Sequence, residues 1–303
     1  MSRRRLLKSA LLAAGGLTAV TALGCESEQA PPATARTPQE QGPTPQGRGV
    51  PMFDSDGVSI HYEVFGQGKP IILIHGFAAS LEVNWVSTGW IEALKPTRQV
   101  VGLDARGHGL SDKPHDPQAY AGDEMQNDVI RLMDHLNIDQ GDLFGYSMGA
   151  QISLRLLVSH PSRFTSVVLG GVGDFAWRRS GDSSSGFGSR VAEALLAEDP
   201  STITDPIAKA FRAFAESFNN DLEALAAYMQ AARPGIDGEE LARVALPVLI
   251  VNGEADTLAG SPDELAAAIP GARLVKIPER DHLTVVPDPR FKEAVVQFLS
   301  SVG

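Results

Sequence analysis

The stretch Asp142-Leu-Phe-Gly-Tyr-Ser-Met-Gly-Ala150 carries the strongest indication of the fold, because an apolar run leads into a G-x-S-x-G pattern at Gly145–Gly149. This pattern is typical of a serine on a turn too tight for flanking side chains, with its backbone strained between a strand and a helix. Such a turn pushes the hydroxyl of Ser147 into a cleft, and the following helix directs free N–H groups to the same place. The stretch therefore predicts a nucleophile beside an anion site, if an acid and a histidine follow later.

Apolar runs on both sides of this stretch predict strands that are buried on both faces. These runs are 70–75, 100–104, 166–171, 246–252 and 272–277, and an alternating pattern at 58–65 predicts an outer strand. Helical spacing occurs between them, as in 124–136 and 150–159. Strands that alternate with helices in this way are typical of an α/β fold with a doubly wound, mostly parallel sheet.

One long segment, 172–245, interrupts this alternation because it contains no strand pattern. Within it, 180–189 is rich in glycine and serine and is predicted to be a loop, whereas 207–218 and 222–232 are predicted helices. We expect these helices to form a lid over the carboxyl ends of the strands, where sites in such sheets usually lie. A helical insertion without contact to a substrate is the alternative.

Several motifs occur in an order that resembles the α/β-hydrolase superfamily. They are His75-Gly-Phe77, a D-x-R-G-H-G-x-S loop at 104–111, the G-x-S-x-G pattern, N-G-x-x-D at 252–256 and Asp281-His282. The resemblance runs from Phe53 to the C-terminus. It implies an α/β-hydrolase domain over 52–303, with a helical cap at about 172–245 inserted after the sixth strand, and it implies serine hydrolase activity.

A serine hydroxyl needs a nearby base that is oriented by a carboxylate before it can act as a nucleophile. The order Ser147, Asp256, His282 is the order expected for this superfamily. Asp174, shortly after the strand that ends at Gly171, stays open as an alternative acid. Glu254 is expected to be a solvated neighbour.

Seven histidines compete for the role of base, and His282 is favoured because it follows the last predicted strand. The resemblance assigns His75 and His108 to loop architecture. The remaining histidines, at 61, 115, 135 and 160, are expected to have no role.

The resemblance also implies an oxyanion hole formed by two backbone N–H groups, those of Phe77 and Met148. The reaction that we predict is carboxylic ester hydrolysis through an acyl-serine intermediate. A cofactor-free perhydrolase, a C–C bond hydrolase or a lactonase would use the same residues. An alternative of another class is a non-catalytic surface lipoprotein that binds a ligand or a partner.

We expect neither a metal nor a cofactor, because the sequence lacks metal-ligand spacing and a phosphate-binding loop. The aromatic and aliphatic side chains of the predicted lid suit a small ester-like substrate with an apolar acyl or aryl group. The chain has 303 residues and a formal net charge of −11, so a basic patch for nucleic acid has no obvious place in it.

Residues 1–24 have the order of an export signal. The basic start, Ser2-Arg-Arg-Arg-Leu-Leu-Lys8, precedes an apolar run at 9–23 that is too short for a comfortable membrane span. The start resembles the bacterial twin-arginine signal, with general secretion as the alternative. We therefore expect a signal peptide and a protein that works outside the cytoplasm.

Cys25 is the only cysteine, so a disulfide within the chain is impossible. It follows Ala22-Leu-Gly24 and is similar to the cysteine of a bacterial lipobox, although leucine stands one place later than that pattern prefers. The resemblance implies a lipid anchor at Cys25 in place of a spanning helix; a plain cleavage site is the alternative. Residues 25–51 are rich in Pro, Gln, Thr and Gly and predict a disordered tether.

Overall fold

A computed structural model describes residues 49–178, 186–233 and 235–302, which belong to the second of the two units of the chain, Arg48–Gly303. The predicted signal peptide, Cys25 and nearly all of the predicted tether lie outside the described residues. In the described ranges, no helix has the length and apolar character needed to cross a membrane.

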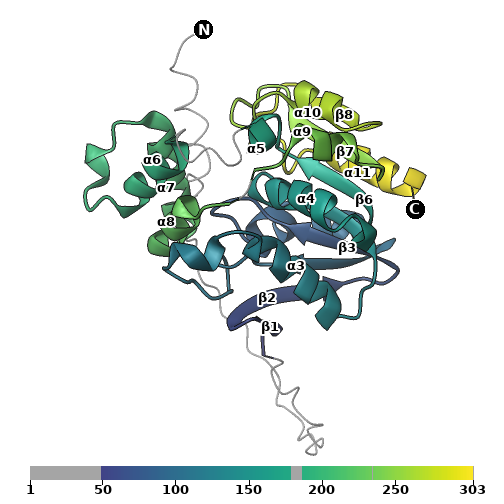
Figure 1. The fold of residues 1–303 in the computed structure, drawn as a ribbon, viewed down its shortest axis with the longest axis horizontal. Coiled ribbons are helices and arrows are strands. Elements are labelled where there is room, and N and C mark those ends of the chain that lie inside the picture. Colours follow the sequence, from purple (N-terminus) through teal and green to yellow (C-terminus); the bar gives the residue numbers. More distant parts are fainter. Residues whose placement is uncertain (1–48, 179–185, 234, 303) are drawn as a thin grey trace, which may run out of the picture. The chain divides into compact units, whose positions relative to one another are not determined.

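Eight strands form one sheet in the order β1-β2-β4-β3-β5-β6-β7-β8 (Figure 1). Their bounds are β1 Met52–Ser55, β2 Val58–Phe65, β3 Lys69–Ile74, β4 Arg98–Leu103, β5 Gly141–Tyr146, β6 Phe164–Gly170, β7 Val248–Gly253 and β8 Arg273–Ile277. Strands β1 and β2 pair antiparallel to their neighbours, and all other pairs are parallel. The predicted mostly parallel sheet is therefore confirmed, and β1 is a strand that the apolar pattern did not predict.

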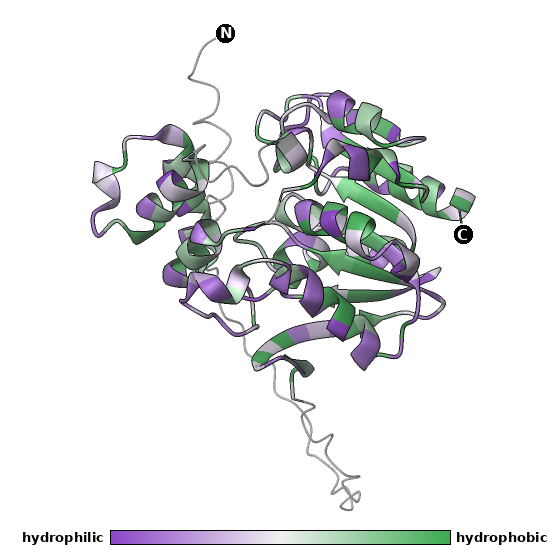
Figure 2. Cartoon of the chain, viewed as in Figure 1, coloured by the Kyte–Doolittle hydropathy of each residue, from purple (hydrophilic) through white to green (hydrophobic). Residues whose placement is uncertain are grey.

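Alternate residues of the central strands face two separate hydrophobic cores, as their period of two requires. In β3, Ile72 and Ile74 join the core that contains α3 (Glu124–His135), α4 (Met148–Ser159) and α10 (Pro262–Ala268). Ile71 and Leu73 join the core that contains α2 (Trp90–Leu94) and α11 (Pro289–Val302). Helices thus cover both faces, and Figure 2 shows the strands between them as largely hydrophobic.

The described parts of the segment between β6 and β7 contain helices joined by loops and turns, and no strand. It contains α5 Phe175–Arg178, α6 Phe187–Leu196, η5 Pro200–Thr202, α7 Pro206–Ser217, α8 Leu222–Gln230 and α9 Gly238–Ala242. We call α6, α7 and α8, which lie together in Figure 1, the helical insertion. The predicted loop at 180–189 is wrong at its end, because α6 begins at Phe187 after a left-handed Gly186 and buries Val191 and Leu195.

Two helices of the insertion, α7 and α8, begin where aspartates satisfy their free N–H groups. Asp205 accepts from the backbone N–H groups of Ile207 and Ala208, and Asp221 accepts from that of Ala224. Such caps stabilise a helix by roughly 1 kcal/mol each. They explain why α7 begins at Pro206 and α8 at Leu222.

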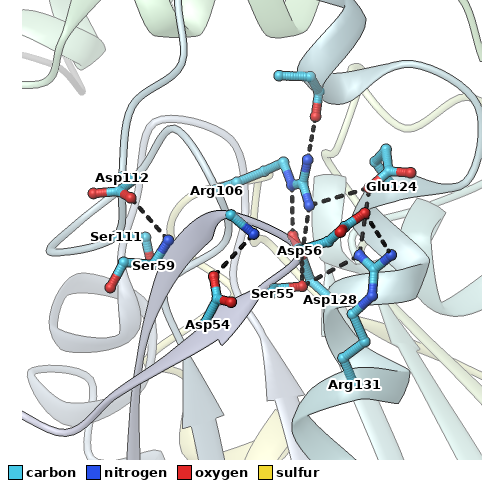
Figure 3. Close-up of polar contacts among 12 residues, drawn as sticks. Asp54, Ser55, Asp56, Ser59, Arg106, Ser111, Asp112, Glu124, Asp128 and Arg131 are labelled. Carbon is cyan, nitrogen blue, oxygen red and sulfur yellow. Dashed lines mark hydrogen bonds and ion pairs between the residues drawn. The ribbon is translucent and has the colours of Figure 1, made fainter.

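A network of charged side chains fixes the loop that follows β4 (Figure 3). Arg106 donates two hydrogen bonds to Asp128 of α3, at 2.7 and 2.6 Å. Asp128 also accepts from Ser55 of β1 at 2.6 Å, and Glu124 lies 3.3 Å from Arg106. Arg131 joins this network, because its Nη1 lies 3.5 Å from Glu124 Oε2. The loop is thereby held against α3 and β1, at the edge of the sheet.

Candidate active site

Ser147 lies at the turn between β5 and α4, where the sequence predicts a nucleophile. Its backbone has φ 52° and ψ −109°, a conformation that residues other than glycine rarely adopt. A Cβ atom at Gly145 would overlap the carbonyl of Gly149, and one at Gly149 would overlap the carbonyl of Ile74. The turn therefore needs both glycines, because backbone atoms occupy the space of their missing side chains.

The side chains of Ser147, His282 and Asp256 form a continuous hydrogen-bonded row. His282 Nε2 lies 2.9 Å from Ser147 Oγ, and His282 Nδ1 lies 2.7 Å from Asp256 Oδ2. Because a carboxylate only accepts, Nδ1 carries the proton and donates to Asp256, so Nε2 accepts from the serine hydroxyl. In this geometry a histidine can withdraw the proton of a serine.

The parallel strands explain why residues so distant in sequence meet. Ser147 follows β5, Asp256 lies in the loop after β7 and His282 lies in the loop after β8. The carboxyl ends of these strands share one edge of the sheet, which is where α/β proteins place their sites. The side chain of Asp256 is only 1% exposed and that of His282 is 14% exposed, so the hydrogen bond between them is shielded while the imidazole stays accessible.

Asp256 has further donors that fix its orientation. The backbone N–H groups of Leu258 and Ala259 donate to its Oδ1 at 2.9 and 3.2 Å. Asp174, the alternative acid, instead accepts from the backbone N–H of Ser261 at 2.6 Å. The carboxylate that the structure brings to His282 is therefore that of Asp256.

The peptide between Gly76 and Phe77 lies beside Ser147 and is held through its carbonyl. The Gly76 carbonyl accepts from His75 Nδ1 at 2.8 Å and from the Ala79 N–H at 3.2 Å. A Cβ atom at Gly76 would lie 3.5 Å from Ser147 Cβ. Because carbonyl and N–H point in opposite directions in a trans peptide, these bonds also fix the direction of the Phe77 N–H.

Met148 is the first residue of α4, so its N–H belongs to the helix end that has no intrahelical acceptor. The helix dipole favours negative charge at that end. Both N–H groups predicted for the oxyanion hole thus occur on backbone that adjoins Ser147.

The ring of Phe77 connects the core of the site to the helical insertion. Its centroid lies 5.8 Å from that of Phe211 in α7 and 5.6 Å from that of Tyr228 in α8. Asn220, between these helices, donates to the carbonyl of Ala78 at 2.9 Å. The insertion therefore packs directly on the loop after β3.

His75 and His108 are both buried near the site but do not contact Ser147 through any hydrogen bond that we observe among the described residues. His75 accepts from the Ala105 N–H at 3.0 Å, so its Nδ1 carries the proton. Burial lowers the pKa of His75, and burial together with the neighbouring His75 lowers the pKa of His108 to about 3. Both rings are therefore neutral and serve the loops, as the resemblance implies.

His61, which was not expected to act in the site, has a structural role that the sequence did not predict. His61 is buried, and its Nδ1 lies 2.8 Å from Asp104 Oδ2. Its position on β2 was predicted to be an outer strand, but the loop after β4 folds over it. His61 thus supports the loop that carries Arg106 and His108.

Two residues of the site carried no signal in the sequence. Asn84, in the π-helix η1 (Glu82–Val86), accepts from the Gly76 N–H at 2.9 Å. The hydroxyl of Tyr146 donates to the backbone carbonyl of His282. Neither a periodicity nor a motif marks them, because their partners are backbone groups that only the folded chain brings near.

Across the described part of the chain, no group of three or more His, Cys, Asp or Glu side chains is arranged to hold a metal ion. Cys25, the predicted lipidation site, cannot be placed because it lies outside that part.

This chain is similar in sequence to known hydrolases over most of its length. Residues 69–199 match the family described as alpha/beta hydrolase fold. The 2-hydroxymuconate semialdehyde hydrolase of Pseudomonas putida is 30% identical over 251 residues, which are 78% of this chain and 88% of that protein. The dihydrolipoyllysine-residue acetyltransferase component of the acetoin cleaving system of Pseudomonas putida is 37% identical over 136 residues. That match covers 43% of this chain but only 33% of the relative, so it concerns one part of a longer protein.

Among solved structures, a hydrolase from Pseudomonas aeruginosa PA01 superposes with a TM-score of 0.70 at 27% identity. The match covers 84% of this chain and 99% of that one. The sheet order, the glycine-flanked serine turn and these similarities agree, and the chain is a hydrolase that belongs to the α/β-hydrolase family.

Proposed function

We propose that this protein is a serine hydrolase that cleaves carboxylic esters through an acyl-Ser147 intermediate. The observation that carries the proposal is the row of side chains in which His282 bridges Ser147 at 2.9 Å and Asp256 at 2.7 Å. A serine at positive φ between a strand and a helix, with a base on its hydroxyl, has the geometry of an activated nucleophile.

In the first half of the reaction, Ser147 Oγ attacks the carbonyl carbon of the ester while His282 Nε2 takes the hydroxyl proton. The imidazolium ion that forms is stabilised by Asp256, which stays ionised. The tetrahedral intermediate then collapses, the bond to the leaving oxygen breaks, and His282 returns its proton to the departing alcohol. This leaves an ester between Ser147 and the acyl group.

In the second half, a water molecule takes the place of the alcohol. His282 accepts a proton from the water as its oxygen attacks the acyl carbon, and Ser147 leaves with that proton. The N–H groups of Phe77 and Met148 hold the oxyanion in both halves. A single donor of this kind can lower the barrier by about 3 kcal/mol.

We further propose that the helical insertion is a lid that sets the preference for the substrate. Phe211 and Tyr228 pack on the ring of Phe77, whose own N–H adjoins the nucleophile. An apolar acyl or aryl group suits this aromatic surface. A panel of esters of graded acyl chain length tests the lid, and equal rates for short polar and long apolar acyl groups would contradict it.

The test of the nucleophile is labelling with a fluorophosphonate probe, which reacts with activated serines. We expect the probe to label the wild-type protein and not the Ser147→Ala variant. No labelling of either protein would refute the enzyme and would favour a protein that only binds a ligand. Labelling that persists in Ser147→Ala would refute Ser147 as the nucleophile, because another serine would then be the activated one. A labelled protein that hydrolyses lactones or cleaves C–C bonds faster than esters would keep the residues and change the substrate class.

For the N-terminal region, we propose export by a twin-arginine-type signal and anchoring to a membrane through a lipid on Cys25. The proposal rests on the basic start, the apolar run and the position of the only cysteine. Fractionation of cells that express the full chain tests it. We expect the protein in the membrane fraction, with Cys25→Ser released from it; identical partitioning of both proteins would end the lipoprotein hypothesis.

A further inference from the structure

Tyr146 connects the nucleophile to the loop of the base. It is the last residue of β5 and directly precedes Ser147, and its side chain is buried in the core beneath α2 and α11. Its hydroxyl donates to the backbone carbonyl of His282, 136 residues away in sequence. Its ring centroid lies 5.4 Å from that of the His282 imidazole, with an angle of 46° between the planes.

Two glycines at the end of β6 create the space for this ring. A Cβ atom at Gly170 would lie 2.8 Å from Tyr146 Cδ2, and one at Gly171 would lie 2.7 Å from Tyr146 Cζ. Gly171 also has a φ of 62°, so the backbone there favours glycine for a second reason. The ring of Phe291 lies 6.4 Å from that of Tyr146. Tyr146 therefore has little freedom to move its hydroxyl.

The loop of His282 is fixed on its other side by contacts that do not involve Tyr146. The Asp281 carboxylate accepts from the N–H groups of Leu283 and Thr284, at 3.1 and 2.8 Å. The Arg280 carbonyl accepts from the Ala255 N–H at 2.8 Å, which ties this loop to that of Asp256. These bonds shape the loop, but the hydroxyl of Tyr146 is the contact that joins it to the strand carrying the nucleophile.

We propose that Tyr146 is a positioning residue whose hydroxyl, through the carbonyl of His282, sets the distance between His282 Nε2 and Ser147 Oγ. The proposal rests on the proposed function, because it concerns how the base reaches the nucleophile. Burial raises the pKa of Tyr146 well above its ordinary value, and the charges of Asp256 and Asp281 act in the same direction. The hydroxyl therefore remains a proton donor throughout the pH range of an ordinary assay.

The test removes only the hydroxyl, with the Tyr146→Phe variant. Tyr120→Phe is a matched control, because Tyr120 is equally buried and its hydroxyl also donates to a backbone carbonyl, that of Pro114 at 2.7 Å. Each variant leaves one buried carbonyl without its donor, which costs about 1–3 kcal/mol of stability in either case. A purely structural role would thus give the two variants the same behaviour.

The readout is the saturation kinetics of labelling by a fluorophosphonate, which separates the maximal rate of reaction from the concentration at half saturation. We expect Tyr146→Phe to lower the maximal rate by ~10- to 100-fold and to leave the half-saturating concentration nearly unchanged, since a small displacement of a reacting group has effects of that size. Tyr120→Phe is expected to react at the wild-type rate. Gly171→Ala, which presses on the ring while keeping the hydroxyl, is a second variant and is expected to act like Tyr146→Phe.

A wild-type maximal rate in both Tyr146→Phe and Gly171→Ala would overturn the proposal, even if their melting temperatures fell. An equal loss of rate in Tyr120→Phe would also overturn it. Failure of the proposed function is a separate result, because in that case the wild-type protein itself would not be labelled at Ser147.

Discussion

In the described part of the chain, two histidine–aspartate pairs with buried carboxylates have nearly the same geometry. His282 Nδ1 lies 2.7 Å from Asp256 Oδ2, and His61 Nδ1 lies 2.8 Å from Asp104 Oδ2. The pairs differ at the second nitrogen of the imidazole. His282 Nε2 faces the hydroxyl of Ser147. His61 Nε2 is buried, makes no hydrogen bond among the described residues and lies 3.6 Å from Glu63 Oε1.

The surroundings of the two carboxylates differ as well. Asp104 accepts from the N–H groups of Leu81 and Leu110, which belong to the loops after β3 and β4. Burial alone would raise the pKa of Asp104, but the hydrogen bond from His61, the nearby His75 and these N–H groups outweigh it and lower the pKa to about 2. The same pair of residues supports a loop in one place and, under the proposed function, a reaction in the other, and the pairs differ in the group that faces the second nitrogen of the imidazole.

Replacement of each histidine with glutamine gives the largest expected difference between the two pairs. We expect His282→Gln to lower kcat by ~10⁴-fold or more, because the serine loses its base. His61→Gln is expected to keep kcat within a few-fold while its melting temperature falls. Ester hydrolysis and thermal melting of both variants provide the measurement; a comparable loss of kcat in His61→Gln would mean that the two pairs do not divide the roles as described.

The next largest expected effect on kcat comes from replacing the two candidate acids, Asp256 and Asp174. Asp256→Asn is expected to lower kcat by ~10³- to 10⁴-fold, since the histidine loses the partner that fixes its tautomer. Asp174→Asn serves as the control, because Asp174 accepts from the Ser261 N–H and not from His282. Should Asp174→Asn lose more activity than Asp256→Asn in the same steady-state assay, the acid would have to be reassigned.

For the structural pair, the expected effect is on stability. Asp104→Asn removes a buried charge that faces His61 and two backbone N–H groups, and breaking such a pair costs about 3 kcal/mol. For a domain of this size that corresponds to a fall in the melting temperature of about 6–12 °C. Urea unfolding monitored by circular dichroism measures it, and a free energy of unfolding equal to that of wild type would contradict the structural role of the pair.

A smaller expected effect is the loss of folding stability in acid that is caused by His108, which is buried beside His75. The pKa of His108 is about 3 in the folded chain, against an ordinary value of 6.5, so the unfolded chain binds more protons between these values. Stability from this residue is therefore complete above pH 6.5 and is lost as the pH falls towards 3. Between pH 7 and pH 5 the loss is about 2 kcal/mol.

The His108→Asn variant cannot titrate, and asparagine can still donate to the Arg106 carbonyl that His108 Nδ1 contacts at 3.0 Å. Urea unfolding at pH 7 and pH 5 is the measurement. We expect the variant to lose less stability than wild type over this interval. An equal loss in both proteins would show that His108 is protonated in the folded state or that other groups dominate.

The features of the fold and of the site that the sequence predicts are those that depend on neighbouring residues. The buried strands and the turn at Ser147 were predictable, because apolar runs and glycines that make room for backbone are local properties of the chain. The meeting of Ser147 with His282 and Asp256 was predictable only through the order of the motifs. His61 was misjudged, because the loop that buries it lies more than 40 residues later, at 104–112.

In the helical insertion, too, local sequence predicts only part of the structure. Its helices were largely predictable from their apolar spacing, but the start of α6 within a glycine- and serine-rich run was not, because burial of Val191 and Leu195 outweighs the local composition. Tyr146 and Asn84 were not predictable either. Each bonds a backbone group of a distant loop, and no local pattern records such a partner.

The strained backbone of Ser147 sets a trade-off between stability and activity. A glycine would adopt φ 52° and ψ −109° with little strain, whereas a serine there carries an unfavourable conformation. Ser147→Gly should therefore unfold with a free energy about 1 kcal/mol higher than wild type, measured by urea, and Ser147→Ala should show no such gain. An equal gain in both variants would assign the effect to the hydroxyl instead. If the proposed function holds, the fold gains stability when its nucleophile is replaced by glycine, and the serine at that turn serves catalysis at the expense of stability.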